Sequence, residues 1–97
     1  AAGAKKFGPL PKQLDFKAAR AQLPPAVGCV VWHETATNRA RISYVIKGVK
    51  TSTSIALEHY GERSCVMWCL QWAWRQHRDA GHSDSPHKAV REFSLDA

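Results

Sequence analysis

Cysteine and histidine residues gather in the second half of the chain at spacings that a metal site could use. Cys65, Cys69 and His77 fall within a stretch that is typical of a single helix. A structural zinc site needs four ligands, however, and these usually come from more than one element. We therefore interpret both cysteines as small apolar residues at the contact between the helix and the rest of the core. The sequence predicts no metal ion and no other cofactor.

Two pairs of side chains offer parts of a covalent catalytic site: Cys29 with His33, and Ser64 with His59. Nucleophilic catalysis also needs a third group that orients the histidine and donors that stabilise an oxyanion. No motif in the chain supplies these groups. We expect a protein that is not an enzyme.

Positive charge is the clearest chemical property of the chain. Its 97 residues carry a formal net charge of +6, which favours partners with phosphate backbones or anionic surfaces. Arg39 and Arg41 alternate with apolar residues, so both side chains should lie on one face of a strand, where they can contact guanine or phosphate. Lys47 and Lys50 flank a turn and are either phosphate contacts or ordinary solubility charges.

Three strands are expected to position these side chains. Residues 27–32 are apolar and β-branched, residues 39–46 alternate between apolar and polar, and residues 49–55 follow a Lys47-Gly48 hairpin turn. Such patterns are typical of strands that pair in chain order. The sequence thus predicts a three-stranded antiparallel meander.

A helix is expected after the strands. Residues 62–80 have helical length and precede Gly81, which is placed as a C-terminal cap. The predicted fold is α+β: a three-stranded antiparallel sheet packed on one C-terminal helix, with extended N- and C-terminal arms. We divide the chain into a basic N-terminal arm (residues 1–26), a folded domain (27–80) and a C-terminal tail (81–97).

The predicted helix is apolar on more than one side. One stripe has the i, i+3, i+4, i+7 spacing that should pack on the sheet, which makes its tryptophans core residues rather than base-stacking platforms: Cys65, Trp68, Cys69 and Trp72. A second group lies beside it: Val66, Met67, Leu70 and Trp74. A small sheet cannot cover both groups. The second is covered either by apolar residues of the N-terminal arm (Phe7, Leu10, Leu14 and Phe16) or by a partner protein.

The order of these parts resembles a known DNA-binding family. A Val30-Val31-Trp32 strand precedes a strand with Ala40 and Ile42 and the Lys47-Gly48 turn; Ile55-Ala56-Leu57-Glu58-His59-Tyr60-Gly61 then leads into the helix with Cys65 and Cys69. Residues 27–80 resemble the AP2 DNA-binding domain, and the Tyr60-Gly61 junction is similar to that of apicomplexan AP2 proteins. The resemblance implies a helix packed on a three-stranded sheet whose opposite face enters the DNA major groove.

Carried over by position, the resemblance implies a set of nucleic-acid contacts on the strands: His33, Arg39, Arg41, Ser43, Lys50 and Ser52. Two functions remain open. The first is AP2-type binding of duplex DNA in transcription regulation, in the nucleus. The second is an AP2-derived, non-catalytic structural subunit of a large ribonucleoprotein such as a mitochondrial ribosome, which would contact rRNA and, through the Met67, Leu70, Trp74 face, a neighbouring protein.

Two further features bear on location. The basic start of the chain, residues 1–12, is typical of the flank of an organellar leader. No stretch approaches the roughly 20 consecutive apolar residues that a bilayer-spanning helix needs. We expect no membrane partner.

Overall fold

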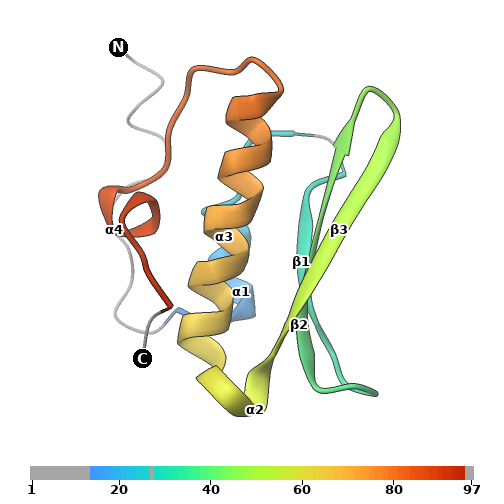
Figure 1. Cartoon of the computed structure of the whole chain (residues 1–97), viewed down its shortest axis with the longest axis vertical. Helices are drawn as coiled ribbons and strands as arrows, with labels where there is room; N and C mark the ends of the chain where they lie inside the picture. Colours follow the sequence, from blue (N-terminus) through green and yellow to red (C-terminus); the bar gives the residue numbers. More distant parts are fainter. Residues whose placement is uncertain (1–13, 27, 96–97) are drawn as a thin grey trace.

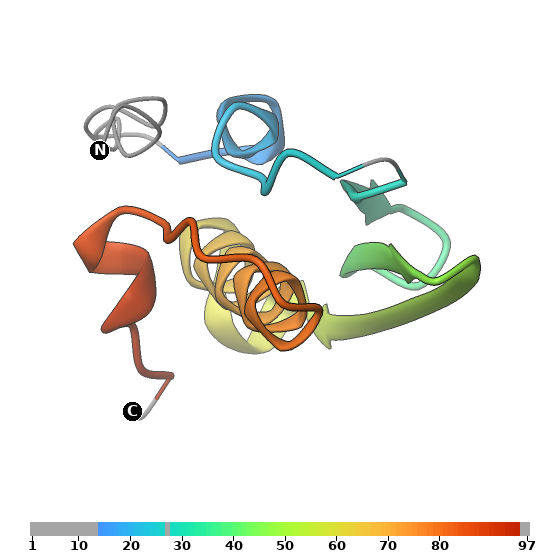
Figure 2. The same ribbon diagram turned by 90° about the horizontal axis from the view of Figure 1, so that it is seen from above.

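A three-stranded antiparallel sheet forms the centre of the computed structural model, which describes residues 14–26 and 28–95. The strands, in sheet order, are β1 (Val30–Glu34), β2 (Arg39–Ile46) and β3 (Val49–Ala56). The helices are α1 (Phe16–Arg20), α2 (Leu57–Tyr60), α3 (Glu62–Asp79) and α4 (Lys88–Arg91). These helices lie on one side of the sheet, as Figures 1 and 2 show, and leave the other side uncovered. The predicted α+β architecture is confirmed.

Alternation along β2 separates the two faces of the sheet as the sequence predicts. Ala40, Ile42 and Tyr44 are at most 2% exposed and belong to the core that α3 covers. The β2–β3 register is set by a two-residue turn at Lys47 and Gly48, whose φ angles are 51° and 79°. Two successive positive φ angles are typical of the hairpin turn that matches the natural twist of strands. The largest difference from the predicted strands is in β1, which continues through Glu34.

Helix α3 runs almost the whole predicted length and places its cysteines against the sheet. The thiol of Cys65 lies 3.4 Å from the carbonyl oxygen of Ala56, and that of Cys69 lies 3.9 Å from the carbonyl oxygen of Ala40. Burial raises the pKa of the Cys69 thiol to about 12. The two tryptophans of the same stripe are only half-buried at its edge. The stripe prediction therefore holds for the cysteines and in part for the tryptophans.

Residues 14–26 and 81–95 fold back over the second apolar group of α3. Met67, Leu70 and Trp74 are no more than 4% exposed, because α1 and the segment around α4 pack against them. The indole N–H of Trp74 donates to the carbonyl oxygen of Gln22 at 2.8 Å. Of the two covers that the sequence left open for this face, segments of the chain itself occupy it, and a partner protein at Met67, Leu70 and Trp74 is not supported.

The arm residues expected over this group are partly accounted for. Leu14 is 3% exposed and Phe16 packs against the core; Phe7 and Leu10 lie outside the described residues. On the other side, the side-chain amide of Gln71 donates to the carbonyl oxygens of Val90, Arg91 and Phe93 at 3.2, 3.3 and 2.8 Å. The folded body therefore extends beyond residues 27–80 in both directions.

A buried polar network links β2, α3 and the segment after α3. The hydroxyl of Tyr44 lies 2.7 Å from Nδ1 of His77, which is 1% exposed. Nε2 of His77 lies 3.6 Å from a carboxylate oxygen of Asp84, and the ring of His82 stacks on the His77 ring with centroids 4.2 Å apart. Burial, with a smaller effect from His82, lowers the pKa of His77, and Asp84 opposes this shift. His77 is therefore a neutral core residue on which the His82 ring stacks, and its Nε2 has no hydrogen-bond partner among the described residues.

Candidate nucleic-acid interface

The sheet face that points away from the helices carries basic and hydroxyl side chains from β2 and β3. Arg41 is paired with Trp32 on β1 and with Ser54 on β3. Directly opposed residues of an antiparallel pair project on the same face. Repeating this register gives the outer face of the sheet: Val30, Trp32, Glu34, Arg39, Arg41, Ser43, Val45, Lys50, Ser52, Ser54 and Ala56. We call this set the outer face.

Arg39 is held along β3 by Ser54. Its Nε donates to the Ser54 hydroxyl oxygen at 2.8 Å, and its Nη2 donates to the Ser54 carbonyl oxygen at 3.3 Å. The side chain is partly buried by these contacts. A guanidinium carries five N–H donors, so these two bonds orient Arg39 and leave further donors for a ligand.

Arg41 forms an ion pair across the first hairpin. Its Nε lies 2.9 Å from Oε1 of Glu34, and the two side chains are 34% and 32% exposed. The contact lacks the alignment of a hydrogen bond, since the same Nε has no hydrogen-bond partner among the described residues. The hydroxyl of Thr37 donates to the Glu34 carboxylate; this bond, followed by Arg41, lowers the pKa of Glu34. Glu34 therefore remains ionised and partly offsets the charge of Arg41.

Ser43 lies on the outer face but is sealed there. It is 1% exposed, and its hydroxyl donates to the carbonyl oxygen of Gly28 at 3.3 Å. Gly28 has a φ of 83°, and a Cβ at this position would lie 2.6 Å from Cγ2 of Val45. Only glycine permits this close approach of the chain to β2. Ser43 consequently has no surface to offer a ligand.

His33 lies on the helix side of the sheet. Its register partner is Ala40, which is buried against α3. The His33 ring stacks on Phe16 of α1 at a centroid distance of 5.6 Å, and its Nε2 lies 3.0 Å from Oδ1 of Asn38. The structure therefore separates His33 from the other predicted contacts.

The predicted contacts thus divide into three groups. Arg39, Arg41, Lys50 and Ser52 gather on the outer face, Lys47 adjoins them in the exposed hairpin turn, and Ser43 and His33 are withdrawn. The sequence analysis did not include three outer-face residues that carry polar groups: Trp32, Glu34 and Ser54. The signal for Trp32 was present, because strand alternation places a residue next to the inward-facing Val31 on the opposite face.

Within residues 14–26 and 28–95, no group of three or more His, Cys, Asp or Glu side chains is arranged to hold a metal ion. In the same part of the chain, no helix combines the length and the apolar character needed to cross a bilayer. Burial raises the pKa of Cys29 to about 12, which keeps its thiol protonated at neutral pH.

Comparison with protein-family models, curated proteins and solved structures finds no match to this chain. The AP2 resemblance accordingly rests on the sequence pattern alone and stays a prediction.

Proposed function

We propose that the chain is a non-enzymatic nucleic-acid-binding module whose contact surface is the outer face, with duplex DNA as its partner. The observation that carries the proposal is that this face lies on the side of the sheet away from the helices (Figure 2), although the segment at Gly28 covers it at Ser43. Arg39, Arg41 and Lys50 lie on it, in a chain of net charge +6. Phosphate contacts from such residues supply much of the affinity of nucleic-acid complexes.

The dimensions of the sheet support a duplex partner. Three strands spaced about 4.8 Å apart span roughly 10 Å, and the major groove of B-form DNA is about 12 Å wide and admits a β-ribbon. Strands β2 and β3 form a hairpin that extends past the adjacent end of β1 in Figure 1. Arg39, Arg41 and Ser54 lie in the three-stranded part of the sheet rather than in this extension. There the outer face would present the two arginines to base edges and the hydroxyls of Ser52 and Ser54 to phosphates.

Binding would exchange one contact of Arg41 for another. A partly exposed ion pair such as Arg41–Glu34 contributes about 0–1 kcal/mol. A charge-assisted hydrogen bond of an arginine to phosphate contributes about 1.5–3 kcal/mol, and the guanidinium can make two in parallel. The exchange therefore favours the complex, while the intramolecular pair orients Arg41 before binding.

A role in transcription within the nucleus follows from the resemblance to AP2 domains. The alternative is an RNA-binding structural subunit of a ribonucleoprotein in mitochondria. One argument for that alternative was a second apolar group on α3 left for a neighbouring protein, and residues 14–26 and 81–95 already cover it. We therefore place duplex DNA first and make RNA an outcome of the test.

The test measures binding of the whole chain to a random-sequence duplex pool and to structured RNA across a salt series. An Arg39→Ala, Arg41→Ala double variant is compared with Lys17→Ala, Arg20→Ala, which removes the same charge from exposed positions on α1. Each lost phosphate contact reduces the log–log salt slope by about 0.9. We expect the outer-face variant to have a log–log salt slope smaller by about two and an affinity at least tenfold lower than the unmodified chain. The control variant should bind like the unmodified chain.

Three outcomes separate the alternatives. Enrichment of one duplex sequence, lost in the outer-face variant, supports the DNA-reading module. Binding to structured RNA alone, also lost in that variant, replaces it with the ribonucleoprotein subunit. Equal binding by the two double variants overturns the outer face as the contact surface.

A further inference from the structure

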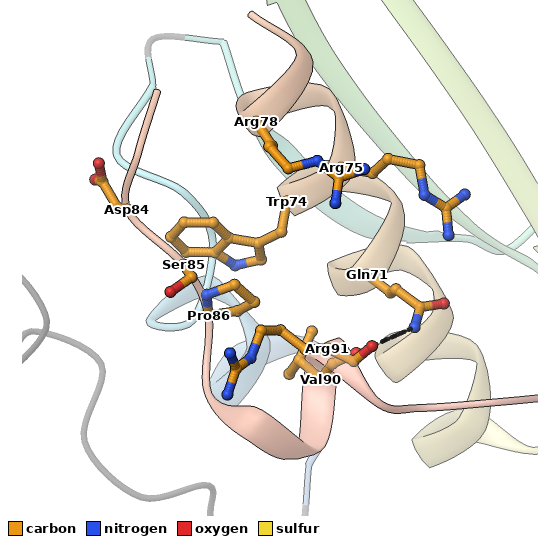
Figure 3. Close-up of a pocket in the computed structure, with 9 residues that line it drawn as sticks. All are labelled: Gln71, Trp74, Arg75, Arg78, Asp84, Ser85, Pro86, Val90 and Arg91. Carbon is orange, nitrogen blue, oxygen red and sulfur yellow. Dashed lines mark hydrogen bonds between the residues drawn. The ribbon is translucent and has the colours of Figure 1, made fainter. Parts of the chain in front are cut away.

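A second basic site lies on the side of α3 remote from the sheet. Here α3 and the segment that contains α4 enclose a pocket of about 220 Å³ (Figure 3). Arg75 and Arg78 line it from α3, and Arg91 lines it from α4. No sequence motif pointed to these residues, because α4 comes beside α3 only after the tail folds back.

The three guanidinium groups are poorly neutralised. Arg78 approaches the carboxylate of Asp79 only at 3.8 Å, with both side chains largely exposed. Neither Arg75 nor Arg91 has an ion pair within residues 14–26 and 28–95. Arg75 and Arg78 are also three residues apart on one helix, a spacing at which like charges repel. An anion between them would remove this repulsion.

The one acidic residue of the lining is directed elsewhere. Asp84 points away from the guanidinium groups in Figure 3, and a carboxylate oxygen of Asp84 lies 3.6 Å from Nε2 of His77. Asp84 thus belongs to the polar network of His77, and it holds the pocket wall in place.

The floor and walls of the pocket are fixed by buried contacts. Trp74 is 4% exposed and is tied to the Gln22 carbonyl. Gln71 donates to successive carbonyls around α4, which holds that segment across from α3. Because the floor is rigid, the long, exposed arginine side chains at the rim can close on a ligand at little cost in ordering the backbone.

We propose that this pocket binds a phosphate ester of nucleotide size or smaller, held by Arg75, Arg78 and Arg91. Guanidinium groups match the oxygens of phosphate in paired hydrogen bonds, and the hydroxyl of Ser85 in the lining adds a neutral donor. A volume near 220 Å³ exceeds that of a bare phosphate, so part of the attached group also enters. The ligand is either a free nucleotide or the phosphorylated end of a nucleic-acid strand. This site is separate from the outer face and does not depend on it.

The experiment follows the indole N–H resonance of Trp74 in NMR spectra of the whole ¹⁵N-labelled chain. The resonance is assigned as the one that disappears in Trp74→Phe. The probes are inorganic phosphate, adenosine monophosphate, adenosine without phosphate, and a short single-stranded RNA with either a 5′-phosphate or a 5′-hydroxyl. We expect saturable shifts with each phosphate monoester and none with adenosine.

Single variants Arg78→Gln and Arg91→Gln should each weaken adenosine monophosphate binding about tenfold, as expected for a lost charge-assisted hydrogen bond. The Arg39→Ala, Arg41→Ala variant should leave it unchanged, so failure of the outer face does not affect this result. Tighter binding of the 5′-phosphorylated RNA than of adenosine monophosphate identifies a strand end as the source, and the reverse identifies a free nucleotide. The proposal would be overturned if adenosine caused equal shifts or if both arginine variants bound as well as the unmodified chain. It would also be overturned if the shifts did not saturate at about 10 mM ligand, a concentration sufficient for a millimolar site.

Discussion

Replacing Tyr44 with Phe removes the hydroxyl that meets His77 in the core and leaves the two rings otherwise unchanged. Both residues are at most 2% exposed, and the oxygen lies 2.7 Å from Nδ1 of His77. A buried polar atom that loses its hydrogen-bond partner costs about 1–3 kcal/mol. We therefore expect Tyr44→Phe to lower the free energy of unfolding by about 2 kcal/mol, a large share of the roughly 5–15 kcal/mol typical of a domain.

The measurement is urea unfolding followed by tryptophan fluorescence at pH 8, where His77 is neutral. The control is Tyr60→Phe, since Tyr60 is 48% exposed and its substitution should change stability by less than about 0.5 kcal/mol. In thermal unfolding the same loss corresponds to a decrease in Tm of roughly 8–16 °C for a domain of this size. The matched pair separates the buried hydrogen bond from the general effect of losing a hydroxyl.

A double variant, Tyr44→Phe with His77→Leu, tests the cause. Removing both polar partners should cost less than the sum of the single changes, because no unpaired group then remains in the core. The buried hydrogen bond would not stabilise the fold as argued if Tyr44→Phe were within about 0.5 kcal/mol of the unmodified chain in stability. The same conclusion would follow if the two single changes were strictly additive in the double variant.

Three other perturbations test separate parts of the fold. The pKa of His77 is lowered in the folded state from its ordinary 6.5, so the unfolded chain binds the proton more readily. The free energy of unfolding should therefore be highest above pH 6.5 and fall as the pH decreases toward the folded pKa. Urea titrations from pH 8 to 5 should show this decrease in the unmodified chain and not in His77→Gln. Gly28→Ala should cost more than Gly81→Ala in the same assay, since both have positive φ but only the former would meet Val45 at 2.6 Å. A thiol reagent at pH 8 should leave all three cysteines unmodified until urea unfolds the chain, because they are buried: Cys29, Cys65 and Cys69.

The sequence was most informative where local pattern and packing agree. The alternation around Arg39 and Arg41 and the Lys47-Gly48 turn determine the hairpin, its register and the identity of its two faces. The apolar spacing that includes Cys65 and Cys69 likewise determines which side of α3 contacts the sheet. In each case a single repeat of apolar residues predicts both the type of element and the face of it that is buried.

Contacts between segments distant in the chain could not be predicted in this way. Nothing near Trp74 in the sequence indicates that Gln22 accepts its hydrogen bond, and nothing near Arg91 indicates that Gln71 holds its carbonyl. The withdrawal of Ser43 depends on the path of Gly28, whereas alternation from the inward-facing Val31 already places His33 on the helix side. The outer face was therefore largely predictable, whereas the pocket behind α3 was not.

Because the segments before the sheet and after α3 both pack over α3, they are part of the cooperative folding unit. Residues 14–26 and 81–95 contribute to the same core as the sheet, so a fragment trimmed to residues 27–80 would expose Leu70 and Trp74 to water. Burying two such side chains contributes about 1.5–3 kcal/mol each, comparable with the whole stability margin of a small domain. The terminal segments are thus part of the folding unit, and detachment of either one removes most of the stability of the whole domain.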